Sequence, residues 1–122
     1  MARIITTGGN IPEYFSDWAR THGVEYVIKE TLFRDAWYAE IGGNYAGRDV
    51  MLIEPSDVTA TPVTDGLSSR GVNVHCYPTA EKALEAYSAV NPDLVIATFS
   101  LPGIKVPELL SRIRELEAKA QG

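Results

Sequence analysis

Five short runs rich in β-forming residues alternate with five stretches of helical periodicity, and this alternation limits the fold more than any other feature. The β-rich runs are Arg3–Thr7, Glu25–Lys29, Val50–Glu54, Val72–Cys76 and Asp93–Thr98. The helical stretches are Pro12–His22, Thr31–Ile41, Val58–Arg70, Thr79–Val90 and Val106–Ala120. Several β-rich runs are continuously apolar, as in strands that are covered on both faces. The pattern predicts one α/β domain with a doubly wound five-stranded parallel sheet and helices on both faces.

Glycine, proline and capping residues predict where these helices begin and end. Gly23, Gly71 and the pair Asn91-Pro92 each follow a helical stretch and indicate its end. Gly42-Gly43 predicts the same after Ile41, and the least structured segment, Gly42–Asp49, is the best candidate for a linker. Within Val58–Arg70, the residues expected to point inward are Pro62, Val63 and Leu67.

Composition and charge narrow the possible functions. The chain has 122 residues, 45% of them apolar, which fits one compact domain with a real core. Its net charge of −5 and its scattered Lys and Arg residues argue against nucleic-acid binding. No apolar run approaches the roughly 20 residues that a membrane span needs, and the N-terminus lacks a signal sequence. A single cysteine excludes an internal disulfide. From these features together we expect a cytoplasmic protein that binds neither nucleic acid nor membrane.

Three segments of the second part of the chain carry a shared set of motifs: Val50–Asp57 (VMLIEPSD), Thr79–Tyr87 (TAEKALEAY) and Asn91–Gly103 (NPDLVIATFSLPG). Together they resemble the front of a response-regulator receiver domain of two-component signal transduction, of the chemotaxis-receiver kind. Val50–Asp57 (VMLIEPSD) is similar to the first receiver strand and its acidic loop. Thr79–Tyr87 is similar to the second receiver helix. Asn91–Gly103 (NPDLVIATFSLPG) is similar to the third strand with its Leu-Pro-Gly loop, and this match sets the register.

The first part of the chain resembles the back of the same domain. Arg3–Gly8 is similar to the fourth receiver strand, and Val24–Thr31 to the fifth, with an aromatic residue three positions before a lysine. The resemblance implies a flavodoxin-like, circularly permuted domain: residues 1–41 form the back, 42–49 the linker and 50–122 the front. The implied strand order, from edge to edge, is Val72–Cys76, Val50–Glu54, Asp93–Thr98, Arg3–Thr7, Glu25–Lys29.

The resemblance also assigns a degenerate phosphorylation site. Thr98 stands where a receiver has its phosphoacceptor aspartate, and Glu54 followed by Pro55 stands where it has its acid pair. The hydroxyl residue is Thr7 and the lysine is Lys29, while Thr7 and Tyr26 match the residues that switch conformation. Mg²⁺ needs several hard oxygen ligands, which this set lacks. We therefore expect a pseudo-receiver, a phosphorylation-independent module for protein interaction, with no catalytic residue, metal or cofactor; it would not be an enzyme.

The candidate site residues and the two histidines also have plain structural interpretations. Lys29 can extend from a strand end or pair with Glu54, and Thr7 can close a turn. Tyr26 can be a half-buried aromatic residue with a solvated hydroxyl. His22 lies near the end of a helix, where its charge is favourable. For His75 and Cys76, on a predicted edge strand, we expect structural roles.

Four large aromatic residues are the candidates for a binding surface. They are Tyr14, Trp18, Trp37 and Tyr38, on the helices Pro12–His22 and Thr31–Ile41. One core face rarely takes so many, and aromatic residues are enriched at binding hot spots. We expect a protein partner or self-association at the surface made by these helices and the strand Glu25–Lys29.

Two alternatives remain open from the sequence. The segment Thr6–Asn10 (TTGGN) resembles the phosphate-binding loop of flavodoxins, and a glycine-rich turn before a helix can bind an anion. The chain would then be a small-ligand domain that binds flavin or phosphate. The glycine-rich joint is also compatible with an engineered permutant that has no activity.

Overall fold

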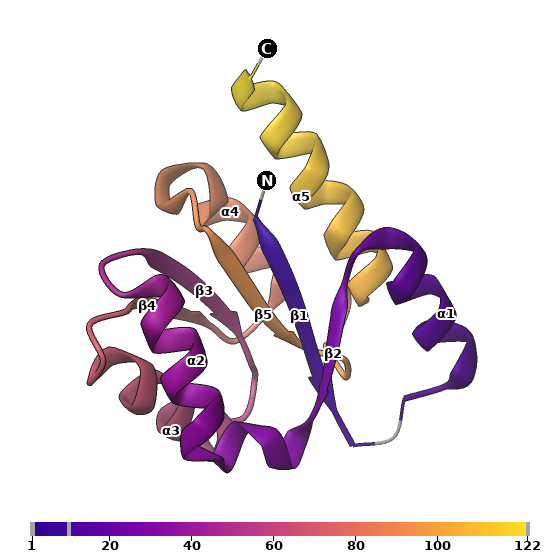
Figure 1. The fold of residues 1–122 in the computed structure, drawn as a ribbon. Helices are drawn as coiled ribbons and strands as arrows, with labels where there is room; N and C mark the ends of the chain where they lie inside the picture. Colours follow the sequence, from indigo (N-terminus) through magenta and orange to yellow (C-terminus); the bar gives the residue numbers. More distant parts are fainter. Residues whose placement is uncertain (1, 10, 122) are drawn as a thin grey trace.

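All five predicted strands lie side by side in one parallel sheet, in the order β2-β1-β5-β3-β4 (Figure 1). The strands are β1 (Arg3–Gly8), β2 (Glu25–Ile28), β3 (Asp49–Ile53), β4 (Asn73–Tyr77) and β5 (Leu94–Thr98). The structure, a computed structural model, describes residues 2–9 and 11–121. β1 pairs with β5 on one side and with β2 on the other, so the predicted strand order is confirmed.

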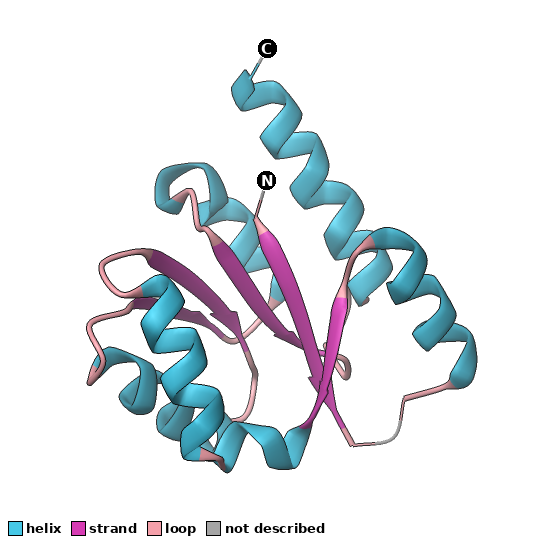
Figure 2. Cartoon of the chain, in the orientation of Figure 1, coloured by secondary structure: helices cyan, strands magenta, loops and turns pink. Residues whose placement is uncertain are grey.

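Helices cover both faces of the sheet (Figure 2). They are α1 (Glu13–His22), α2 (Asp35–Tyr45), α3 (Asp57–Ser68), α4 (Ala80–Val90) and α5 (Val106–Gln121), with a short 3₁₀ helix, η1 (Lys29–Phe33). One hydrophobic cluster joins α1, α4 and α5 to the sheet, and a second joins α2, α3 and η1 to the opposite face. Alternate residues of each strand serve the two clusters: Ile4 belongs to the first and Ile5 to the second. The flavodoxin-like doubly wound class predicted from the sequence is confirmed.

The sequence predicted the end of α2 wrongly. The helix runs through Gly42 and Gly43 to Tyr45, so most of the predicted linker is either helix or strand, and only residues 46–48 join α2 to β3. Gly42 is buried, and a Cβ atom there would lie 2.7 Å from Cδ of Arg70. Gly42 therefore allows a close contact with the side chain of Arg70, which follows α3. The turn comes at Gly47, whose φ is +75°.

Two further details of the helices differ from the prediction. The segment predicted as one helix over Thr31–Ile41 is η1 followed by α2, which begins at Asp35. Pro62 is exposed, because α3 turns Ala60, Val63 and Leu67 toward the sheet. Proline supplies no backbone N–H, and its place on the solvated side lets water replace the lost bond.

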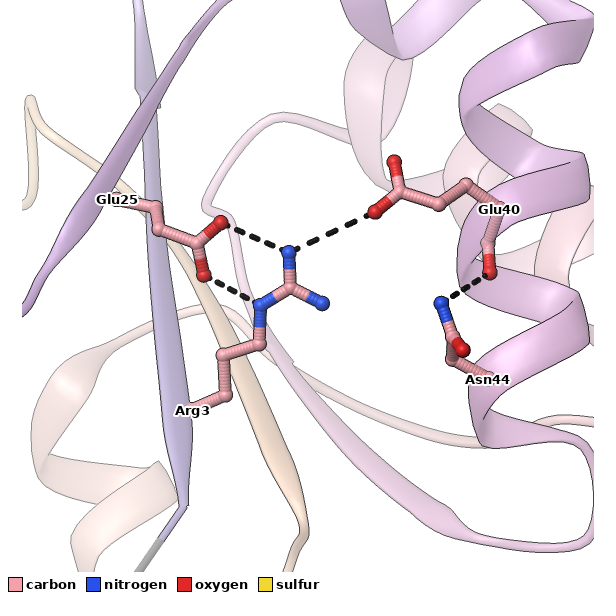
Figure 3. Close-up of polar contacts among 4 residues, drawn as sticks. All are labelled: Arg3, Glu25, Glu40 and Asn44. Atoms are coloured by element: carbon pink, nitrogen blue, oxygen red, sulfur yellow. Dashed lines mark hydrogen bonds and ion pairs between the residues drawn. The ribbon is translucent and has the colours of Figure 1, made fainter.

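Arg3 ties the amino ends of β1 and β2 to α2, at the edge opposite the candidate site (Figure 3). Its guanidinium bonds both carboxylate oxygens of Glu25, with one N–H···O distance of 2.8 Å, and lies 3.7 Å from the carboxylate of Glu40. Asn44 bonds the Glu40 carbonyl from the next turn of α2. A two-point arginine–carboxylate pair is geometrically specific, so this cluster fixes the edge strand to its neighbours.

Candidate functional site

The predicted site residues lie together at the carboxyl edge of the sheet. Thr7 pairs in register with Thr98, and Ile53 pairs with Ala97, so Glu54 follows the strand next to Thr98. Lys29 follows the last residue of β2. The helices after β3 and β5 pack on opposite faces of the sheet, which makes the gap between these neighbouring strands the topological switch point. Ligands of doubly wound sheets bind at such points.

Glu54 is the buried acid of this edge. Its residue is 8% exposed, and its carboxylate accepts a hydrogen bond of 3.2 Å from the backbone N–H of Ser56. Burial raises its pKa above the ordinary glutamate value, while the Ser56 bond and the positive charge of Lys29 partly oppose that shift. Lys29 itself is exposed, and among the described residues it forms no ion pair with Glu54. The two groups interact only at longer range.

Glu54→Gln is expected to make stability less dependent on pH. Below about pH 4.5, the ordinary glutamate value, the native and unfolded chains both hold the proton. As pH rises through the raised native pKa, the buried Glu54 carboxyl becomes charged, and the parent protein loses stability. The Glu54→Gln variant keeps its stability, because the amide stays neutral. Urea unfolding of both proteins from acidic to neutral pH should show the variant gaining relative stability as pH rises. A constant difference would contradict the burial of this carboxyl.

The other site residues supply hydroxyl groups rather than acids. Thr7 is 4% exposed, and its carbonyl accepts a hydrogen bond of 2.8 Å from the N–H of Phe99. Thr98 is half-buried at the end of β5, and Pro55 is exposed. Within residues 2–9 and 11–121 there is no group of three or more acids, histidines or cysteines placed to hold a metal ion. The edge therefore offers one buried acid, two hydroxyls and one distant lysine.

Tyr26 is held by hydrogen bonds. It is half-buried on β2, and its hydroxyl donates to the carbonyls of Gly8 and Gly9, at 3.0 and 3.3 Å. These bonds join β2 to the last residue of β1 and to the loop after it, both part of the glycine-rich segment that resembles a phosphate loop. Asn10, the last residue of that segment, lies outside the described residues.

The aromatic binding candidates divide into exposed and buried residues. Tyr14 is 72% exposed, and Trp18 is half-buried between the rings of Phe15 and His22. Trp37 and Tyr38 are only 6% and 7% exposed, so their choice as interface residues was wrong. Because α2 begins at Asp35, both rings face the sheet and α3, and the Tyr38 hydroxyl donates to the Leu32 carbonyl.

Sequence reasoning missed two exposed apolar residues near the same edge of the sheet. Ile28 ends the edge strand β2 and is 45% exposed, and Phe33 ends η1 and is 57% exposed. Hydrophobic periodicity in the sequence did not reveal them, because the elements that hold them are too short for a pattern to distinguish the buried face from the exposed face. The 3₁₀ turn decides their exposure.

The histidines and the cysteine lie on the helix and the edge strand that the sequence predicted. The His22 ring nitrogen lies 2.8 Å from the Trp18 carbonyl, in the last turn of α1. His75 lies 3.0 Å from Asp49 across the pairing of β4 with β3. Cys76 is exposed on the edge strand β4.

A cavity of about 690 Å³ opens beside the carboxyl edge, between the start of α1 and the β5–α5 loop. Its lining is Tyr14, Phe15, Pro55, Phe99, Ser100, Leu101, Pro102, Lys105 and Pro107. The loops after β3 and β5 both contribute, so the cavity lies at the switch point. Of these residues, only Tyr14 and Pro55 were candidate site or interface residues from the sequence, because the lining combines three segments that are far apart in the chain.

Comparisons of the chain with protein-family models, characterised proteins and solved structures found no match. Within residues 2–9 and 11–121, none of the helices is both long enough and apolar enough to cross a bilayer.

Proposed function

We propose that this chain is a circularly permuted, receiver-like module that binds protein without being phosphorylated and has no catalytic activity of its own. The observation that carries the proposal is the carboxyl edge, where Glu54, Thr98, Thr7 and Lys29 occupy the positions that the receiver resemblance assigns. A cytoplasmic location accords with the single, unpaired cysteine.

The chemistry of this edge supports independence from phosphorylation. Receiver-type transfer needs a carboxylate at the end of β5, and the residue there is Thr98. Mg²⁺ requires near-octahedral oxygen ligation, usually with carboxylates, and Glu54 is the only buried acid at this edge in the part of the chain that the structure describes. Its carboxylate is already engaged by the N–H of Ser56.

The junction of the chain ends supports the permuted order. The Ala2 N–H donates to the Glu117 carboxylate at 2.7 Å, and the Arg114 guanidinium donates to the Ala2 carbonyl at 3.2 Å. These bonds hold the start of β1 against α5. In a receiver domain, the helix and the strand that correspond to α5 and β1 are consecutive in the chain. The proximity of α5 and β1 therefore accords with a permutation whose ends fall between these two elements.

The edge formed by α1, β2 and η1 is the interaction surface we propose, and a second copy of the chain is its expected partner. β2 is an edge strand, and a sheet edge is a template on which a strand of another chain can pair. Tyr14, Ile28 and Phe33 expose apolar area on these three elements. Exposed apolar area beside a free strand edge is typical of association sites.

Self-association is expected to be concentration-dependent and insensitive to phosphodonors. Sedimentation velocity should show a dimer forming as concentration rises, unchanged by acetyl phosphate with Mg²⁺, with no increase in intact mass. Phe33→Ser should weaken the dimer about tenfold or more, because an aromatic contact at an interface centre is lost. Val58→Ser, at a residue on α3 that is 80% exposed, is the matched control and should leave association unchanged. A monomer at every concentration, or a phosphorylated product, would overturn the proposal.

A further inference from the structure

We infer that the cavity between α1 and the β5–α5 loop is a binding site for a small aromatic anion. This inference goes beyond the proposed function and does not depend on it. The cavity's volume, about 690 Å³, lies within the roughly 300–1,000 Å³ that is usual for small-molecule sites. Its place at the switch point of the sheet is where such sites occur in doubly wound folds.

The walls of the cavity are rigid apolar rings. Phe15 is 1% exposed and meets the ring of Phe99 edge to face, with 4.6 Å between centroids. Pro55, Pro102 and Pro107 line the remaining sides. Rings with few rotamers lose little conformational entropy on binding, so the walls are preorganised for a flat, apolar ligand. Aromatic faces and edges also favour an aromatic ligand over an aliphatic one.

The charge on the cavity lining is positive. Among the described residues, Lys105 is the only charged residue of the lining, and no carboxylate belongs to it. The Lys105 ammonium donates to the Leu101 carbonyl at 2.8 Å, which orients the charge and leaves further N–H donors for a ligand.

Two helices also begin at the cavity. Tyr14 and Phe15 belong to the first turn of α1, and Pro107 to that of α5, so the positive ends of both helix dipoles lie nearby. The cap residue of α1 is Pro12, which offers no side-chain oxygen to the first N–H groups. Of the first-turn acids, Glu108 pairs with Arg112, and Glu13 is exposed outside the lining. An anion is therefore the complement of this cavity, in a protein whose net charge is −5.

A second groove shows the opposite character and serves as an internal comparison. It measures about 380 Å³, lies between α4 and α5, and carries three acids, Glu81, Glu85 and Glu115, against one cation, Arg112, around Leu84 and other apolar residues. An aromatic anion would be repelled there. Size and apolar character alone would allow either groove, whereas charge selects the cavity at the switch point.

Two fluorescent probes of similar shape test both parts of the inference. Anilinonaphthalene sulfonate carries a negative charge, and N-phenylnaphthylamine is neutral. The folded chain should bind the sulfonate saturably with a stoichiometry of one, and the backbone NMR shifts that change should be those of the first turn of α1 and of the β5–α5 loop. Lys105→Met should weaken sulfonate binding about fivefold to tenfold, a loss of roughly 1–1.4 kcal/mol, and leave the neutral probe unchanged.

Wall variants and a control complete the experiment. Phe99→Ala should weaken both probes about tenfold, and Tyr14→Ala, at a residue exposed enough to spare folding, should weaken both by a smaller factor. Leu84→Ala, in the acidic groove, should change neither. Phe33→Ser should keep probe binding while losing association, which separates this inference from the proposed function. Equal sulfonate binding by Lys105→Met, or shift changes centred on α4, would overturn the assignment.

Discussion

Trp37→Ala is expected to lower the free energy of unfolding by about 3–5 kcal/mol, the usual cost of removing a large buried aromatic side chain. Trp37 is 6% exposed and packs at 5.1 Å, edge to face, against Tyr38 in the cluster beneath α2 and α3. Tyr14→Ala removes a ring of comparable type that is 72% exposed, and it should change stability by less than about 0.5 kcal/mol.

Urea unfolding of the parent and both variants measures these free energies. Unchanged m-values would indicate that all three proteins expose the same surface on unfolding. The comparison separates core from surface among the four aromatic residues that the sequence grouped together. A loss below about 1 kcal/mol for Trp37→Ala would mean that its ring contributes little to the core, and would contradict the structure of α2.

Two glycines in helices should respond to alanine with opposite signs. At Gly66 in α3, a Cβ atom would lie 2.6 Å from Cε1 of Tyr38, a buried ring that cannot turn away freely. Gly66→Ala should therefore cost about 1–3 kcal/mol through overpacking. At Gly43 in α2, a Cβ atom would meet nothing within 4 Å. Gly43→Ala should raise stability by about 0.8–1 kcal/mol, the gain in helix propensity.

Thermal or urea unfolding of the two single variants would decide the matter, and the double variant should be close to additive if the sites are independent. Destabilisation at Gly43 would place a helix end there, as the sequence suggested. A neutral or stabilising Gly66→Ala would show that Tyr38 does not pack against α3 as closely as described.

Local signals in the sequence were sufficient for several elements. Thr79, a residue type that favours the N-cap position, caps α4: its hydroxyl accepts a hydrogen bond of 3.2 Å from the N–H of Lys82. Gly23 and Asn91 end α1 and α4 in the left-handed conformation. Each of these features depends on residues within one turn of one another, so the sequence contains the whole cause.

The candidate site was predictable in position but not in contacts. Residues at the ends of parallel strands must meet at one edge, so Glu54, Thr7, Thr98 and Lys29 were expected there once the strand order was known. The burial of Glu54 and its bond from Ser56 depend on how α3 begins and on what covers β3. No spacing in the sequence expresses these distances.

By itself, then, the amino-acid sequence determined the alternation of strands and helices, the apolar strands of a doubly covered sheet and the local caps. Tertiary structure alone decided that Gly42 and Gly66 are contact points, that Trp37 and Tyr38 are core, and that a cavity forms beside Phe99. The physical reason is the range of the interactions. Propensity and capping act within a few residues, whereas burial and cavity shape depend on segments that only the folded chain brings together.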